Sequence, residues 1–168
     1  MAKLIVLFFG AESPAATLAN AAADGAQSVR FTEVDLVAGA PHQQPAGRRV
    51  KPLAAPEQLL EYDGVLIACP AAGDVPTELS LLLGALERMT PADCFTNTVF
   101  GVAGGENTTL LGRVERLGGI IVSEPRGFAD PEARARALGA RAAKVVGWVR
   151  HALGHEHGHE HGHEHHHH

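Results

Sequence analysis

The sequence is poor in the residues that mark several classes of protein. Its 168 residues include only two cysteines, Cys69 and Cys94, and they form no CxxC pair. A disulfide framework and a thiolate zinc site both lack support, since each needs clustered or paired cysteines. Low cysteine usage is typical of a reducing cytoplasm, which is the location we expect.

Clustered positive charge is also missing. The chain has 14 Lys and Arg against 19 Asp and Glu, for a formal net charge of -5, with no basic stripe. Nucleic acids and anionic membranes attract clustered Lys and Arg, so we expect neither as a partner. The opening "MAKLIVLFFG" is too short to span a membrane, and we interpret it as a first strand rather than an export signal.

Two nucleotide-binding motifs are absent as well. No GxGxxG and no GxxxxGK[ST] occurs, so the sequence has neither a Rossmann dinucleotide turn nor a P-loop. What the sequence does have is an alternation of short apolar runs with helical patterns. The apolar runs cover residues 4–9, 29–36, 64–69, 98–103 and 118–123.

Most of these runs lack apolar/polar alternation, which is typical of parallel strands covered on both faces. Only the second alternates, so we expect it at an edge of the sheet. Helical patterns cover residues 13–25, 76–89, 107–118 and 130–153, two of which start with a cap residue followed by proline. The stretch 37–63 is mostly loop, with a short helix from Pro56.

This alternation predicts a three-layer α/β sandwich formed by residues 1–153. Right-handed crossovers favour a five-stranded parallel sheet with strand order 2-1-3-4-5. In such a sheet, ligands bind outside the carboxyl ends of the strands, where the strand order reverses. Three loops meet there, and their sequences are "GAESPAAT", "CPAAGDVP" and "VAGGENTT".

The first loop offers a helix N-terminus, with Ser13 as its cap and Thr17 in the first turn. Unpaired amides and the helix dipole favour an anion there, so a phosphate site is one interpretation. The other interpretation is an ordinary helix start that needs no ligand. Pro14 favours the second view, because it lacks an amide that a phosphate could use.

The second and third loops differ in what they offer. The second has small residues around Pro70 and no aromatic residue, and we interpret Cys69 as a buried apolar residue rather than a reactive thiol. In the third, Gly104 and Gly105 permit a close approach of ligand to backbone. A plain strand-to-helix connection explains the same glycines equally well.

Three stretches together resemble the flavodoxin-like family. "KLIVLFFG" with "ATLANAAADGA" resembles its first strand and helix, and "AAPEQLLEYDGVLIACP" resembles its approach to the third strand. "VFGVAGGENTTLLGRVERLGGIIV" resembles its fourth strand, glycine loop and fifth strand. The similarity is closer to the tryptophan-repressor-binding-protein type of NAD(P)H:quinone oxidoreductase, and it covers residues 3–153.

The resemblance implies a flavodoxin-like fold with FMN at the three loops, reduction of quinones by a nicotinamide, and often a tetramer. It implies flavin contacts from residues in all three loops: Ser13, Thr17, Pro70, Gly104, Gly105, Glu106 and Thr108. No catalytic acid or base is implied by the residues that match.

Departures from the family's pattern weaken this implied site. The first loop keeps only Thr17 of the usual residues, with Glu12 beside the expected phosphate, and Gly73 stands where the family has an aromatic residue. Gly118 replaces a histidine expected near the quinone. Each lost hydrogen bond is worth about 1–3 kcal/mol, so FMN binding would become weak or be lost. Phe9 and Phe128 are the remaining candidates for stacking on the ring.

The C-terminal stretch 154–168 repeats GHEH three times and ends in further histidines. Alternating imidazoles chelate divalent Zn, Ni, Cu and Co, and a stretch without apolar residues should be disordered without metal. The expected ligands are His155, His157, His159, His161, His163 and His165. A purification tag is the alternative, but tags are usually uninterrupted histidine runs.

Two functions therefore remain open from the sequence. The first is an FMN-dependent NAD(P)H:quinone oxidoreductase with a weakened flavin site. The second is a non-enzymatic flavodoxin-like scaffold that binds a transition metal through its tail or a partner protein through its loops. Trp148 and the apolar final helix also allow a homo-oligomer.

Overall fold

The computed structural model describes residues 1–9, 13–39, 50–70, 75–89, 93–105 and 108–159. The elements follow in the order β1 (Ala2–Phe8), α1 (Ser13–Gln27), β2 (Thr32–Ala38), β3 (Val50–Pro52), the 3-10 helix η1 (Pro56–Glu61), β4 (Gly64–Ala68), α2 (Thr77–Glu87), β5 (Val99–Ala103), α3 (Thr108–Glu115), β6 (Ile120–Ile121) and α4 (Pro131–His159).

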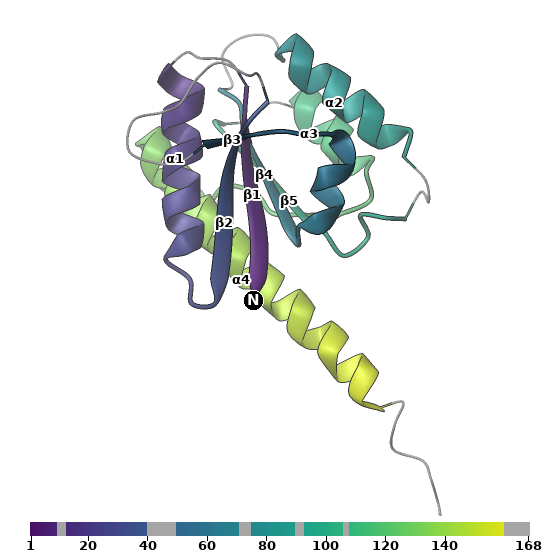
Figure 1. Cartoon of the computed structure of the whole chain (residues 1–168). Coiled ribbons are helices and arrows are strands. Elements are labelled where there is room, and N and C mark those ends of the chain that lie inside the picture. The colour runs from purple at the N-terminus through teal and green to yellow at the C-terminus, as the bar shows by residue number, and fades with distance from the viewer. Residues whose placement is uncertain (10–12, 40–49, 71–74, 90–92, 106–107, 160–168) are drawn as a thin grey trace, which may run out of the picture.

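All strands join one parallel sheet in the order β3-β2-β1-β4-β5-β6. Helices α1 and α4 cover one face, and α2 and α3 cover the other (Figure 1). The expected α/β architecture with a parallel sheet is confirmed, as is the short helix from Pro56. The expected five-stranded sheet in the order 2-1-3-4-5 is wrong, because β3 adds a sixth strand outside β2, so β2 is not an edge strand.

Polar contacts hold β3 against the sheet. Lys51 on β3 lies 2.9 Å from Asp35 on β2, and Tyr62 donates a 2.6 Å hydrogen bond to the same carboxylate. Burial, together with this bond to Asp35, raises the pKa of Tyr62 to about 12, so the hydroxyl stays protonated at neutral pH. A three-residue strand with a lysine and a proline carries no apolar run, which is why the sequence did not reveal it.

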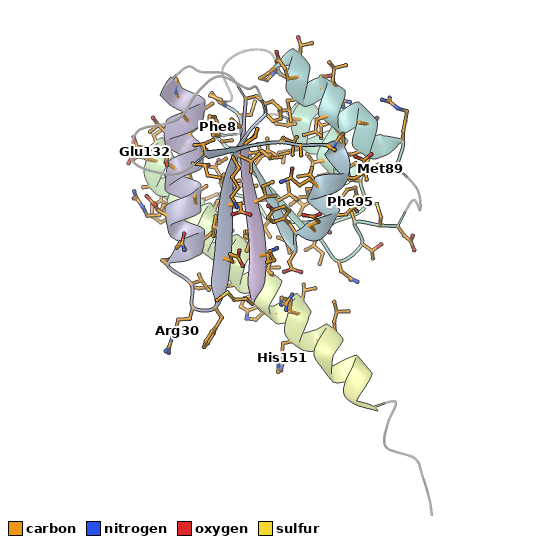
Figure 2. All side chains as sticks on the ribbon, in the orientation of Figure 1. Phe8, Arg30, Met89, Phe95, Glu132 and His151 are labelled. Carbon is orange, nitrogen blue, oxygen red and sulfur yellow. The ribbon has the colours of Figure 1, made fainter. Side chains whose placement is uncertain are left out.

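Two apolar layers lie on either side of the sheet. On the α1 and α4 side, Leu4, Val6 and Phe8 of β1 pack into an alanine-rich layer. On the α2 and α3 side, Phe95 meets Phe100 edge to face with ring centroids 5.5 Å apart. Figure 2 shows Phe8 and Phe95 in these separate layers. Burial on both faces explains the continuous apolar runs of the inner strands.

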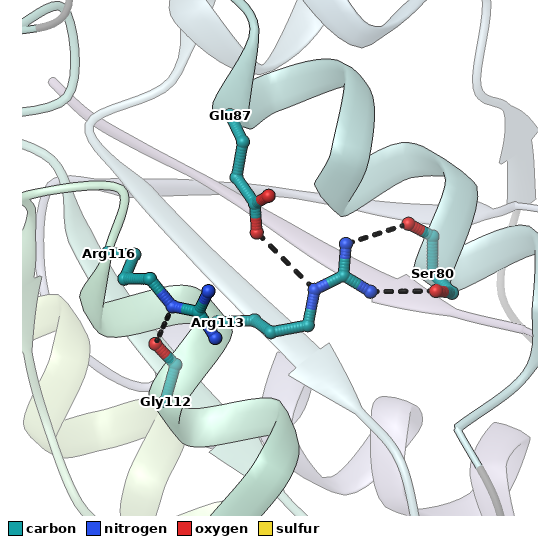
Figure 3. Close-up of polar contacts among 5 residues, drawn as sticks. All are labelled: Ser80, Glu87, Gly112, Arg113 and Arg116. Carbon is teal, nitrogen blue, oxygen red and sulfur yellow. Dashed lines mark hydrogen bonds and ion pairs between the residues drawn. The ribbon is translucent and has the colours of Figure 1, made fainter.

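Arg113 of α3 joins the two helices on that face. Its guanidinium donates to the Ser80 hydroxyl at 2.7 Å and to the Ser80 carbonyl at 3.1 Å, and its Nε lies 3.3 Å from Glu87 of α2 (Figure 3). Arg116, just after the end of α3, donates instead to the Gly112 carbonyl at 3.3 Å. The forked contact of Arg113 fixes α3 relative to α2.

Helix α4 continues past the expected domain boundary at Leu153. It runs to His159, and the part that carries His151 extends beyond the sheet (Figures 1 and 2). Gly154 and Gly158 each cost about 1 kcal/mol relative to alanine in a helix, which is too little to force an end. Residues 160–168 lie outside the described residues. Within the described ranges, no helix combines the length and apolarity needed to cross a membrane.

Helices α1 and α4 touch backbone to backbone. A Cβ added at Gly139 of α4 would lie 1.9 Å from the Ala22 carbonyl oxygen, and one added at Gly25 of α1 would lie 1.8 Å from the Arg136 carbonyl oxygen. Two glycines, one on each helix, therefore set the distance between these helices. Small alanines fill the rest of the contact.

We expect Gly139→Ala to destabilise the protein by about 2–3 kcal/mol, because the added methyl forces the two helices apart. Gly147→Ala is the matched control on the same helix, since nothing lies within 4 Å of its added Cβ. The control should stabilise by up to about 1 kcal/mol through helix propensity. Urea unfolding followed by circular dichroism measures both, and equal effects would contradict the close contact.

Candidate functional site

The carboxyl ends of β1, β4, β5 and β6 lie at one edge of the sheet, as parallel strands require. Helix α1 begins at Ser13, shortly after β1 ends at Phe8. Three of the residues discussed above, Glu12, Gly73 and Glu106, lie outside the described residues. The candidate site is therefore defined by the described residues around them.

The loops after β4 and β5 are in direct contact. Cys69 donates its backbone N–H to the Ala103 carbonyl at 2.9 Å, and a Cβ added at Gly104 would lie 2.1 Å from the Cys69 carbonyl oxygen. Gly104 also has φ 129° and Gly105 has φ 105°, a region that other residues rarely adopt. The structure thus brings Pro70 next to the Gly104–Gly105 turn.

Cys69 lies beneath this contact. It is buried, with its Sγ 3.8 Å from the Pro70 carbonyl oxygen. Burial raises the pKa of the Cys69 thiol, so the reactive thiolate is disfavoured at neutral pH. This agrees with its interpretation as an apolar residue of the core.

Glu124, which follows β6, binds the amides of the glycine loop. Its Oε1 accepts hydrogen bonds from Gly104 N at 2.5 Å and from Gly105 N at 3.0 Å. Its Oε2 lies 3.7 Å from Nε of Arg134 on α4, and only 13% of the side chain is exposed. The two amides that the sequence assigned to a cofactor are therefore bonded to a carboxylate of the chain itself.

Glu124 was missed by sequence reasoning. It stands in the stretch "EPRGFADP", which carries no recognisable motif. The only available signal was an acid placed directly after a strand, and that signal occurs at many positions in any protein. Its partners become evident only when the ends of β5 and β6 are placed side by side.

The two aromatic candidates for ring stacking have different positions. Phe9 is buried, and its ring packs on Gly39, where an added Cβ would lie 2.0 Å from the ring. Phe9 is therefore not available to a ligand in this arrangement. Phe128 is 44% exposed and lines a cavity at the same edge of the sheet.

This cavity has a volume of about 520 Å³ and lies between α3 and the segment 122–128. It borders the glycine loop through Gly105 and Thr108. Pockets of about 300–1,000 Å³ are typical of small-molecule sites. The cavity is beside β5 and β6, whereas the sequence placed the site at the loops after β1, β4 and β5.

The remaining predicted contacts stay predictions. Thr17 is half-buried within α1, and Thr108 is exposed at the start of α3. No group of three or more potential metal ligands occurs within the described ranges. The histidines predicted to bind metal from residue 155 onward lie where the side chains are not described.

Solved structures show where this architecture occurs. The two-electron-reduced flavodoxin of Megasphaera elsdenii matches with a TM-score of 0.60 and 16% identity, covering 84% of this chain and 98% of that one. The chain has a flavodoxin-like fold. No protein-family model matches the sequence.

Two further structures with this fold are also similar. A flavodoxin from Streptococcus pneumonia TIGR4 has a TM-score of 0.59 and 13% identity, covering 85% of this chain and 99% of that one. FerB, a flavoenzyme NAD(P)H:(acceptor) oxidoreductase from Paracoccus denitrificans, has a TM-score of 0.53 and 13% identity, covering 90% and 98%. At these identities the likeness concerns the fold.

Within this flavodoxin-like fold, the Glu124 contact makes a direct prediction. In Glu124→Ala, the Gly104 and Gly105 amides lose their acceptor and should exchange hydrogen at least tenfold faster. NMR-detected hydrogen exchange measures them one by one. Glu132→Ala, an exposed acid on the first turn of α4, is the control. Unchanged exchange at both glycines would contradict the contact.

Proposed function

We propose that the protein is a flavodoxin-like oxidoreductase that binds FMN weakly at the carboxyl ends of β1, β4 and β5. The observation that carries the proposal is the Gly104–Gly105 turn, whose two amides converge on a single acceptor atom. Support comes from the fold, which is shared with flavodoxins and with a flavoenzyme NAD(P)H oxidoreductase. Nicotinamide is the proposed electron donor, and a quinone is the proposed acceptor.

The phosphate end of FMN fits the residues present. Helix α1 begins at Ser13, and the N–H groups of its first turn lack intrahelical partners. An anion at a helix N-terminus is stabilised by these donors and by the helix dipole. Thr17 would add a hydroxyl donor from the next turn.

The ring end fits only when Glu124 moves. The Gly104 and Gly105 amides are suitable donors to the polar edge of a flavin ring, but Glu124 occupies both. Releasing them costs two hydrogen bonds to a charged group, each worth about 1.5–3 kcal/mol. The flavin regains part of this free energy by taking the same amides, so the net effect is weaker binding.

Bound FMN would supply two-electron chemistry between the nicotinamide and the acceptor. The protein's part is to hold the phosphate at α1 and the ring edge at the glycine turn. The tight packing of Gly104 on the Cys69 carbonyl keeps that turn in one position. We assign no acid or base to the reaction.

The decisive measurement is a titration of FMN fluorescence with protein. We expect saturable quenching with a dissociation constant in the micromolar range or weaker for the natural sequence. Glu124→Ala should bind at least tenfold more tightly, because it frees two amides and removes a negative charge; 1.4 kcal/mol corresponds to a factor of ten. Glu132→Ala should bind like the natural sequence.

One result would rule out this function, and another would rule out only the competition by Glu124. If neither the natural chain nor Glu124→Ala saturates in excess FMN, the flavin proposal fails. If both bind FMN with equal affinity, the site exists but Glu124 does not compete for it. NAD(P)H oxidation with a quinone acceptor is the assay that follows positive binding.

A metal-binding role of the C-terminal stretch is the second candidate. The extension of α4 to His159 favours it, because residues 155 and 159 are one helical turn apart. Residues at this spacing lie on the same side of a helix, and paired imidazoles chelate transition metals. Trp148 of α4 is 68% exposed and offers an apolar contact to a second copy of the chain.

We expect Ni²⁺ or Zn²⁺ to bind the full chain and to increase its helix content. Protonation of imidazoles competes with the metal, so affinity should fall as the pH drops through about 6.5. Calorimetry and circular dichroism measure the two effects. Replacing every histidine from His155 onward by Gln should abolish binding, while His42→Gln should not. Equal affinity in both variants would contradict the role.

A further inference from the structure

The lining of the cavity between α3 and the segment 122–128 combines polar and apolar side chains. Its polar members include Arg126, Arg134 and Ser123, and its apolar members include Leu111, Val122 and Phe128. Arginine presents a planar fork that matches a carboxylate, and Phe128 offers a half-exposed aromatic face. The lining thus combines the two features that select an organic anion with a ring.

The charge balance of the lining favours an anion. Glu124 is the only acid among the described lining residues, and its carboxylate is already bonded to two amides and paired with Arg134. Arg126 is exposed and has no ion-pair partner within the described ranges. An incoming carboxylate would therefore meet the positive charge of Arg126, which no acid of the described ranges neutralises.

An unsatisfied donor points to the same ligand. The Nε of Arg134 is buried and makes no hydrogen bond to a described residue, because Glu124 lies beyond hydrogen-bond distance at 3.7 Å. A buried donor without an acceptor costs about 1–3 kcal/mol. Arg134 also lines the cavity, so a ligand oxygen bound there would offer its guanidinium a further acceptor.

We propose that this cavity is a binding site for a small aromatic carboxylate. The carboxylate pairs with Arg126 and reaches toward Arg134, and the ring packs against Phe128 and the other apolar lining residues. A volume of about 520 Å³ accommodates one or two fused rings. The site needs no flavin, so ligand binding there can be measured without FMN.

The probe is 2-naphthoate, titrated into the whole ¹⁵N-labelled protein without flavin. Binding should be saturable, with shifts at the amides of Gly105, Ser123 and Gly127. The neutral analogue 2-naphthylmethanol carries the same ring without the charge and should bind at least tenfold more weakly. A preference for the anion would distinguish specific binding at this site from nonspecific binding of the ring to an apolar surface.

Two variants test the named residues. Arg126→Gln and Phe128→Ala should each weaken 2-naphthoate binding at least fivefold, and both residues are exposed, so folding should be retained. Arg116→Gln is the matched control, because Arg116 is exposed, bonds to the Gly112 carbonyl and is not among the described residues that line the cavity. The ¹⁵N spectrum of each variant verifies the fold.

Three results would overturn the proposal. The first is the absence of saturable shifts at the cavity residues. The second is equal affinity for the acid and the alcohol. The third is unchanged 2-naphthoate affinity in Arg126→Gln. The titration contains no FMN, so failure of the flavin proposal would leave this proposal intact. Conversely, these three results would overturn this proposal without affecting the flavin proposal.

Discussion

The contact between Gly104 and the Cys69 carbonyl is the constraint on which this end of the sheet depends. No side chain fits there, since an added Cβ would lie 2.1 Å from the carbonyl oxygen. The chain must also turn through positive φ at both Gly104 and Gly105. These two conditions direct successive amides to one point, and successive amides that converge form an anion-binding concavity. The loop is thus made for an acceptor, whichever group supplies it.

In this chain the acceptor is Glu124, and its position has two opposite consequences. It satisfies two amides and anchors the segment after β6 to the loop after β5, which stabilises the folded protein. It also occupies the donors that a flavin ring would use. The anchored segment 122–128 also lines the cavity beside α3. If the chain binds flavin as proposed, stability and flavin affinity would oppose each other at this one carboxylate.

The fold followed from the sequence where its signals are local. Continuous apolar runs predicted the main strands, and helical patterns, two of them with cap-proline starts, predicted all four α-helices. Both signals depend on neighbouring residues. Strand β3 was missed, since its pairing comes from Lys51 and from the β2 backbone rather than from an apolar run. Adjacent glycines identified the third loop, but the Glu124 contact spans elements that only the tertiary fold brings together. Phe9 appeared suitable for stacking because nothing in the sequence shows its packing on Gly39.

The proposed flavin site and the proposed site for an aromatic carboxylate have residues in common. Gly105 contributes its amide to one and lines the other, and Glu124 connects both through its bonds to the glycine turn and its pairing with Arg134. A carboxylate ligand that engages Arg134 competes with Glu124 for that cation. Weaker pairing with Arg134 would in turn loosen the hold of Glu124 on the amides, which favours flavin binding. Linkage is reciprocal. Flavin that displaces Glu124 would therefore raise the affinity for the aromatic carboxylate by the same factor by which the carboxylate raises the affinity for flavin.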